Sequence, residues 1–404
     1  MKKVEVNNII LSVGSKCISR VGDVMFDFAN NTFLAGLGSG SMTLVGLYQA
    51  SESIVGILFN LFGGVIADNL KRKKLIMLSN FLSGIICICA SFVVKNKYLV
   101  YAIVIANIFL AIMSSIASPA YKAFTKEIVT KDTIPKINSY LETGSTIINV
   151  TIPTIAVIFY KALGIQGSLL LDGVSFLLSA SLIFFTRPID SEEPNNKMQI
   201  NTIFKDLFEG IKYLIHNKNI FLVILLSALV NFFLAAYNLL LPYTNEMFPN
   251  FSIDLYAVFL TSEAIGGLAG ALLSNFLNKN LSVFKLLLYL GISGATLLIG
   301  PFLYLTFNNY LILAISPVCF NMFLTVFNIQ FFSIVQQEVD NKYLGRVFGI
   351  IFTIALLFMP IGTTVFSKII NVKQVFNLTF VGLAILGLSS LFWLLFFYNK
   401  LNRQ

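Results

Sequence analysis

Twelve long apolar segments recur along the chain, and this pattern constrains the fold more than any other feature. They lie near residues 8–36, 41–68, 74–95, 98–121, 134–161, 167–187, 219–244, 253–278, 282–306, 308–336, 343–370 and 375–399. Each segment is long enough for a helix to cross the roughly 30 Å hydrocarbon core of a bilayer. Inside that core the backbone must satisfy its own hydrogen bonds, which forces helices. The sequence therefore predicts an all-α membrane protein with twelve transmembrane helices.

The composition excludes most classes of soluble protein. Of the 404 residues, 57% are hydrophobic and 12% are charged, and the mean hydropathy is +0.83. An ordinary soluble domain is about 25% charged, so a soluble chain could not cover so apolar an interior. The sequence has one histidine, no phosphate-binding loop motif and no nucleophile constellation, and its four cysteines lack metal spacing. We therefore expect no enzyme activity, no cofactor and no metal site.

Lysine and arginine are concentrated in alternate connections between the predicted helices. If the N-terminus is inside, the inner segments carry 21 of these residues and the outer segments carry 5. Basic residues favour the cytoplasmic side of a membrane, which accounts for the net charge of +9 without any nucleic acid. We expect a monomer in the cell membrane with both termini cytoplasmic. The abundance of Lys, Asn and Ile favours a bacterial source.

One long polar connection divides the chain into two halves. We predict an N-terminal six-helix half over 1–187, a cytoplasmic linker with an amphipathic helix over 188–218, and a C-terminal six-helix half over 219–404. A weak repeat relates the halves, because the surroundings of Glu52 in the second helix are echoed around Glu263 in the eighth. Such repeats indicate two pseudo-symmetric halves.

The segment Gly64-Val-Ile-Ala-Asp-Asn-Leu-Lys-Arg-Lys73 resembles the signature loop between helices 2 and 3 of the major facilitator superfamily. The matching positions include Gly64, Asp68, Arg72 and Lys73. The resemblance implies a gate at the inner face, where the glycine permits close helix packing and the acid pairs with a basic group. The alternative is an ordinary basic loop that obeys the positive-inside rule.

Further motifs narrow the resemblance to one branch of that superfamily. They are Ser19–Asp23, Ser118–Ala120, Leu171–Ala180, Leu241–Tyr243 and Gly345–Gly349. Their order and spacing are similar to those of the drug:proton antiporter branch, which includes macrolide-efflux and siderophore exporters. The resemblance implies two six-helix halves that rock about a central site, with proton entry driving the exit of an amphiphilic small molecule.

Two departures weaken the link to proton coupling. The helix 5 signature of antiporters is degraded, since Pro153 lacks its flanking glycines. Helix 4 carries Asn107 and not the membrane-embedded arginine of many proton-coupled relatives. The expectation of proton coupling therefore rests on the branch as a whole and on the acidic residues within the spans.

Charged residues inside the first predicted helix are the leading candidates for proton coupling, because such residues are costly in a membrane. Arg20, Asp23 and Asp27 are spaced by three and four residues, so they share one helix face, which we expect to turn toward a cavity. Arg20 can act as the charge partner of Asp23, which leaves Asp27 without an obvious local partner. The alternative is a structural network that binds both acids to Arg20 or Lys16.

Glu52 and Glu263 are predicted near the middle of the bilayer, in repeat-related helices. They could carry protons or attract a cationic drug, or each could hydrogen-bond a neighbouring helix. Four further residues are candidates for the wall of a cavity, namely Asn30, Asn31, Phe232 and Phe233.

Three functions remain open from the sequence. The first is a secondary exporter of amphiphilic drugs or antibiotics of the macrolide type, with the substrate, protons and the lipid bilayer as partners. The second keeps the fold and exports an endogenous siderophore or small peptide. The third is a membrane sensor or scaffold without transport, which the degraded helix 5 signature favours and the retained acids oppose.

Overall fold

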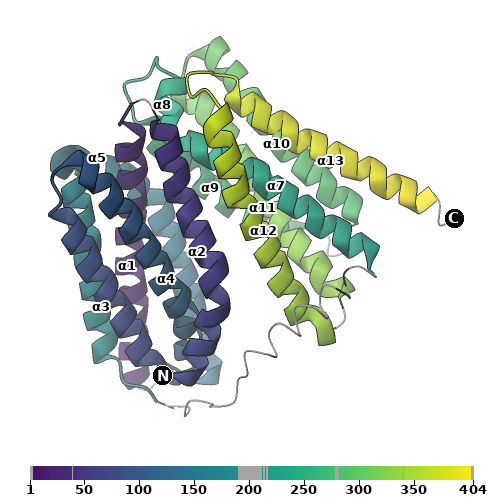
Figure 1. Cartoon of the computed structure of the whole chain (residues 1–404). Helices are drawn as coiled ribbons and strands as arrows, with labels where there is room; N and C mark the ends of the chain where they lie inside the picture. The colour runs from purple at the N-terminus through teal and green to yellow at the C-terminus, as the bar shows by residue number, and fades with distance from the viewer. Residues whose placement is uncertain are drawn as a thin grey trace. The chain divides into compact units, whose positions relative to one another are not determined.

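The computed structural model describes residues 3–38, 40–189, 212, 214, 217–277, 282–339 and 341–401, and all of its regular elements in these ranges are helices (Figure 1). The chain divides into two compact units, Met1–Met198 and Gln199–Gln404. The boundary between them lies within the predicted linker. That linker, residues 188–218, and its predicted amphipathic helix lie largely outside the described residues.

The described part of the first unit contains five continuous helices by backbone hydrogen bonding. They are α1 (Lys3–Ala35), α2 (Ser41–Asn69), α3 (Arg72–Ser91), α4 (Asn96–Ile128) and α5 (Ile134–Phe185), with a short 3-10 turn at Lys131–Thr133. Gly164 interrupts α5 with a φ of 66° and a ψ of −167°. Glycine adopts this backbone conformation without a steric penalty, so one residue separates two helices of membrane length. The described part of this unit therefore has six long helical segments.

The second unit also has six long helices in its described residues. They are α7 (Lys218–Leu240), α9 (Leu255–Phe276), α10 (Val283–Phe307), α11 (Tyr310–Glu338), α12 (Asn341–Ile369) and α13 (Asn377–Leu401). A 3-10 turn (Leu241–Tyr243) and the short helix α8 (Thr244–Met247) follow α7. The predicted all-α fold with two sets of six helices is confirmed, although some ends were wrong. For example, α4 continues through Pro119 to Ile128, beyond the predicted end near residue 121.

Nine of the described helices are long and apolar enough to cross a membrane, with α5 counted once. Helix α12 adds the shorter apolar stretch Leu357–Ile369. Helix α1 is outside this set and carries four charged residues beyond its first turn, Lys16, Arg20, Asp23 and Asp27. Such residues need protein or water around them within a bilayer, so the packing of α1 determines what its charges can do.

A repeated glycine contact joins the third and sixth helices of each unit. A Cβ atom on Gly84 of α3 would lie 2.9 Å from the carbonyl oxygen of Gly173 in α5. In the second unit, a Cβ atom on Gly382 of α13 would lie 2.6 Å from the carbonyl oxygen of Gly294 in α10. Small residues allow membrane helices to approach this closely. The internal repeat is therefore present in the packing of both units.

Candidate functional site

A cavity of about 150 Å³ in the first unit collects the charged face of α1. Its walls come from α1, α2, α3, α4 and one residue of α5, and they include Arg20, Asp23, Asp27 and Glu52. Asp23 and Asp27 are half-buried, whereas Glu52 is exposed at the surface of its unit. Sites for drug-sized ligands usually have about 300–1,000 Å³, so this cavity suits water or a small group.

Asp27 has a hydrogen-bonding partner on the neighbouring helix. The hydroxyl of Tyr48 in α2 donates to Asp27 Oδ1 at 2.8 Å. Tyr48 is fully buried, and Asn30 Nδ2 donates to its hydroxyl oxygen at 3.4 Å. The expectation that Asp27 lacks a local partner was therefore wrong. Local spacing could not indicate this pair, because it depends on how α2 is rotated against α1.

Arg20 contacts α5 and not the adjacent acid. Its Nε and Nη2 atoms donate to Asn149 Oδ1 at 3.2 and 3.0 Å. Among the residues that the structure describes, neither an ion pair nor a hydrogen bond joins Arg20 to Asp23. The predicted pairing is corrected accordingly. The long arginine side chain spans to the next helix, which leaves the Asp23 carboxyl in the wall of the cavity.

The remaining predicted cavity residues lie elsewhere. Asn30 and Asn31 are buried, and Asn31 Oδ1 accepts a hydrogen bond from Gln49 Nε2 at 3.1 Å, so they connect α1 to α2. Phe232 and Phe233 pack against Phe366, with ring centroids 5.0 and 5.8 Å away. Neither pair lines the two cavities described in this section. Phe232 and Phe233 are half-buried, whereas the two asparagines are buried amides that gain from direct hydrogen-bond partners.

Glu263 in the second unit has an arrangement related to that of Asp27. The hydroxyl of Tyr237 in α7 donates to Glu263 Oε1 at 2.7 Å. Asn321 Nδ2 in α11 donates to the backbone oxygen of Glu263 at 2.8 Å. In the first unit, Asn107 Nδ2 in α4 likewise donates to the backbone oxygen of Tyr48 at 3.0 Å. Both units therefore hold a tyrosine–acid pair between their first two helices, fastened by an asparagine of the fourth.

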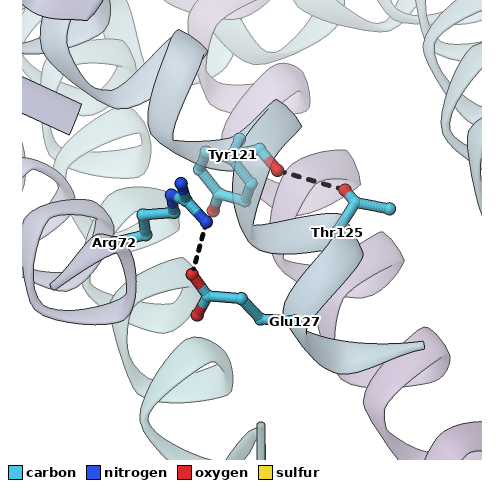
Figure 2. Close-up of polar contacts among 4 residues, drawn as sticks. All are labelled: Arg72, Tyr121, Thr125 and Glu127. Carbon is cyan, nitrogen blue, oxygen red and sulfur yellow. Dashed lines mark hydrogen bonds and ion pairs between the residues drawn. The ribbon is translucent and has the colours of Figure 1, made fainter. Parts of the chain in front are cut away.

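The predicted gate motif is linked to α4 by an ion pair. Arg72 Nη1 lies 2.9 Å from Glu127 Oε1, and these side chains are 16% and 10% exposed (Figure 2). Lys73 Nζ donates to the backbone oxygens of Phe184 and Thr186, both at 2.8 Å, at the end of α5. Figure 2 also shows Thr125, whose hydroxyl donates to the backbone oxygen of Tyr121 at 3.1 Å.

The other two residues of the gate motif, Gly64 and Asp68, lie in α2, but their side chains are outside the described part of the chain. Their assignment to a gate thus stays a prediction. Glu127, the partner of Arg72, was not selected from the sequence, because an acid at the end of a helix beside a basic loop carries no distinctive signal.

The first residues of α1 form hydrogen bonds to the end of the first unit that carries the Arg72–Glu127 ion pair. Glu5 Oε1 accepts hydrogen bonds from the backbone nitrogen and hydroxyl of Thr130 at 2.9 and 2.7 Å. These bonds stabilise the charged carboxylate and lower the pKa of Glu5 to about 2. Asn8 Nδ2 donates to the backbone oxygens of Ile128 and Arg187 at 3.0 and 2.7 Å. The N-terminal end of α1 is therefore bound to the ends of α4 and α5.

A larger cavity of about 510 Å³ adjoins the acidic one in the first unit. The two share four wall residues, Lys16, Arg20, Ser118 and Tyr121. Lys122 and Glu142 add further charges to the larger cavity. Its volume falls in the range of small-molecule sites. The acids of α1 thus adjoin a space large enough for an organic ligand.

Asp172 in α5 is a further buried acid that sequence reasoning used only as part of a motif. It has no exposed surface, and Oδ2 accepts a hydrogen bond from Cys87 Sγ at 3.3 Å. The carboxyl packs against Gly22 in α1, where a Cβ atom would overlap it. The signal that could have found this residue was available, since an acid interrupts an otherwise apolar stretch.

The fold and these sites can now be compared with known proteins. Residues 16–363 match the family model described as Major Facilitator Superfamily, which is most of the chain. The chain belongs to the Major Facilitator Superfamily. It is therefore a membrane transporter that acts on small molecules, in a family that is not a class of enzymes.

Curated relatives place this superfamily member near efflux proteins. It is 24% identical over 334 residues to macrolide efflux protein A of Enterococcus faecalis, covering 77% of this chain and 98% of the relative. It is 25% identical over 357 residues to macrolide efflux protein A of Streptococcus pyogenes, covering 81% of this chain and 82% of the relative. The predicted resemblance to macrolide-efflux proteins is confirmed.

A solved structure supports the superfamily fold independently. A bacterial homologue of the iron transporter ferroportin, in an inward-facing state, is similar with a TM-score of 0.74. The likeness covers 98% of both chains at 16% sequence identity. At this identity the similarity establishes the Major Facilitator Superfamily fold alone.

Proposed function

We propose that this transporter exports amphiphilic drugs or antibiotics of the macrolide type across a bacterial cell membrane by proton antiport. The observation that carries the proposal is the cluster of Asp23, Asp27 and Glu52 in one cavity, directly beside the larger cavity. The efflux role of the two named relatives supports the same direction of transport.

The acidic cavity has the chemistry that a proton site needs. Three carboxyl groups share a small space, and like charges placed together disfavour simultaneous ionisation. Arg20 is engaged by Asn149, so it does not neutralise either acid of α1 through a direct contact. The carboxyl groups therefore exchange protons as a group, and their occupancy changes when water enters or leaves the cavity.

The larger cavity supplies space for the substrate. Its volume of about 510 Å³ accommodates the polar part of an amphiphile, and Lys16 and Arg20 belong to both cavities. A change in protonation of the acids thus changes the electrostatic potential at these two shared cationic side chains. This shared wall gives proton binding and substrate binding a physical link within one unit.

The orientation follows from the distribution of basic residues along the chain. We place both termini and the Arg72–Glu127 ion pair at the cytoplasmic face, with a monomer as the working unit. Alternating access then exposes the acidic cavity to the two faces of the membrane in turn.

An exporter of acidic cargo, such as a siderophore or small peptide, is the second candidate. Three cationic side chains, those of Lys16, Arg20 and Lys122, line the larger cavity beside the single acid Glu142. This lining favours a substrate that carries a carboxylate. An acidic peptide that competes better than a macrolide for transport would select this second function.

Transport by the purified full chain in liposomes tests the proposal. Radiolabelled erythromycin, a macrolide, should accumulate when a pH gradient is imposed, and a protonophore should abolish the accumulation. Transport that survives the protonophore would remove proton antiport. Failure to transport erythromycin, together with proton-driven transport of an acidic peptide, would transfer the proposal to the second candidate.

A further inference from the structure

We propose that Tyr48 and Tyr237 are matched positioning residues, each of which orients the proton-binding carboxyl of its own unit. The partners are Asp27 for Tyr48 and Glu263 for Tyr237. This inference rests on the proposed proton coupling and extends it to two residues that carry no charge and that no motif selects.

In the first unit Tyr48 is held by hydrogen bonds at its backbone and at its hydroxyl. Asn107 Nδ2 donates to the backbone oxygen of Tyr48 at 3.0 Å, which holds this part of α2 against α4. At the other end, Asn30 Nδ2 donates to the hydroxyl oxygen at 3.4 Å. With its oxygen accepting from Asn30, the hydroxyl directs its own hydrogen at Asp27 Oδ1. The ring is 1% exposed, so water does not compete for that hydrogen.

In the second unit a tyrosine also donates to a carboxyl group, but the two residues lie on the opposite helices of the pair. The acid is on the second helix, α9, and the tyrosine is on the first, α7. Tyr237 is 2% exposed, and its ring centroid lies 5.0 Å from that of Phe320. Asn321 fastens the backbone oxygen of Glu263 to α11 at 2.8 Å. A tyrosine–acid pair with an asparagine clamp thus occurs twice, on positions that the repeat does not superimpose.

The exchange of roles argues against simple inheritance of one residue pattern. With Glu52 aligned on Glu263, Asp27 falls on Asn238 and Tyr48 falls on Phe259. The residues at repeat-related positions therefore differ, whereas a contact between a phenol and a carboxyl occurs in both units. The same contact, made by differently placed residues, points to its chemistry as the property that the two units share.

That chemistry is control of proton release. A hydroxyl that donates to a carboxylate stabilises the charged form, and hydrogen bonds to ionised groups are the strong ones. Without the donor, a carboxyl in an apolar surrounding keeps its proton to higher pH. The tyrosine therefore favours the ionised form of each acid and eases release of its proton.

The groups facing each acid differ between the units. Asp27 faces Asp23 and Arg20 on α1, Glu52 and Tyr48 on α2, and the cavity wall at Asn107 on α4. Glu263 faces Tyr237, and in the described part of the second unit no cationic side chain forms an ion pair with it. Loss of the tyrosine should accordingly be the main change in the proton affinity of Glu263. At Asp27, the neighbouring charges should also contribute to the change in proton affinity.

The experiment is a pH titration of the full chain in liposomes by infrared spectroscopy, which reports the protonated carboxyl band directly. Asp27→Asn and Glu263→Gln identify the two bands by removing them. In Tyr48→Phe and Tyr237→Phe, the midpoint of the matching band should move to higher pH by about one unit, a tenfold change in proton affinity. Tyr304→Phe, a buried ring packed on Phe248, is the matched control and should move neither band.

The outcomes separate this inference from the proposed function. Unmoved midpoints in both variants, or the absence of any band that Asp27→Asn and Glu263→Gln remove, would overturn the positioning role. Shifted midpoints in a chain that transports neither erythromycin nor an acidic peptide would uphold it and remove the proposed transport. The two tyrosine variants are independent, so if one fails to fold the other still decides the question.

Discussion

The two units share their packing but differ in their charge. Each joins its third and sixth helices by facing glycines and holds a tyrosine–acid pair between its first two helices. The first unit adds Asp23, Glu52 and Arg20 around one cavity, whereas Glu263 is the acid that stands at the corresponding level of the second. The comparison teaches that the helix packing is repeated, whereas in the described residues the acids that line a cavity together are those of the first unit.

Removing one acid from each unit is the most severe test of this asymmetry. Asp27→Asn should reduce gradient-driven efflux by about 100-fold, because a positioned proton-transfer group is worth at least that much. Glu263→Gln should reduce it by about 10-fold, since among the described residues Tyr237, and not a second carboxyl, is the partner of Glu263. Efflux from liposomes measures both. Glu246→Gln, an exposed acid of the second unit, is the control, and equal losses in the two units would contradict the asymmetry.

The shared packing can be tested at the glycine contacts. Gly84→Ala and Gly382→Ala should each lower the free energy of unfolding by about 1–3 kcal/mol, the usual cost of overpacking. The loss should be larger at Gly382, where a Cβ atom meets backbone atoms at 2.6 Å, than at Gly84, where it first meets the Leu177 side chain at 2.8 Å. Thermal melting in detergent provides the measurement.

Gly387→Ala is the matched control for this experiment, because it lies on the same helix as Gly382 and a Cβ atom there meets nothing within 4 Å. Full stability of Gly382→Ala would show that the two helices separate without penalty. In that case the repeated glycine contact would not be what the units have in common.

The Arg72–Glu127 ion pair should contribute less to the free energy of unfolding than the glycine contacts, but more than a neutral hydrogen bond. Glu127→Gln removes the charge that Arg72 faces and should cost about 1–2 kcal/mol of stability. Gln330→Met in the second unit removes a neutral hydrogen bond to Ser274 Oγ, 3.1 Å long, and should cost about 1 kcal/mol or less. Melting of both variants at low and high salt measures the difference, and a larger loss for Gln330→Met would reverse the expected order.

The smallest effect is expected at Glu5, outside the membrane-spanning segments. Because Thr130 lowers the pKa of Glu5 to about 2, the bonds favour the folded state at neutral pH. This contribution is complete above the ordinary value of 4.5 and is lost as pH falls toward 2. The melting temperature of wild type should therefore exceed that of Glu5→Gln at pH 7, and the gap should close in acid. A constant gap at all pH values would assign the difference to something other than this carboxylate.

The sequence predicted the helices well because their length and apolar content follow directly from the thickness of a bilayer. It could also place Arg20, Asp23 and Asp27 on one face, because that depends only on helical spacing. It could not predict that Tyr48 meets Asp27 or that Arg20 meets Asn149, because both contacts depend on the rotation of one helix against another.

Aromatic residues were the least predictable part of the candidate site. Phe232 and Phe233 are predicted as cavity residues, and both pack against Phe366 in the second unit. A sequence with 39 phenylalanines offers many equivalent apolar partners for each ring, so periodicity does not select among them. Acids are rarer in the spans, and even so Asp172 was passed over because it was read only as part of a motif.

The break at Gly164 has a mechanical consequence for the first unit. One residue joins the fifth and sixth helical segments, whereas residues 370–376 join α12 to α13 in the second unit. Because a single residue connects the two helical segments of α5, neither segment can shift along its axis without displacing the other. Asn149 lies before this joint and contacts Arg20 of α1. Asp172 lies after it and packs against Gly22 of the same helix, so a tilt of α5 displaces both contacts together.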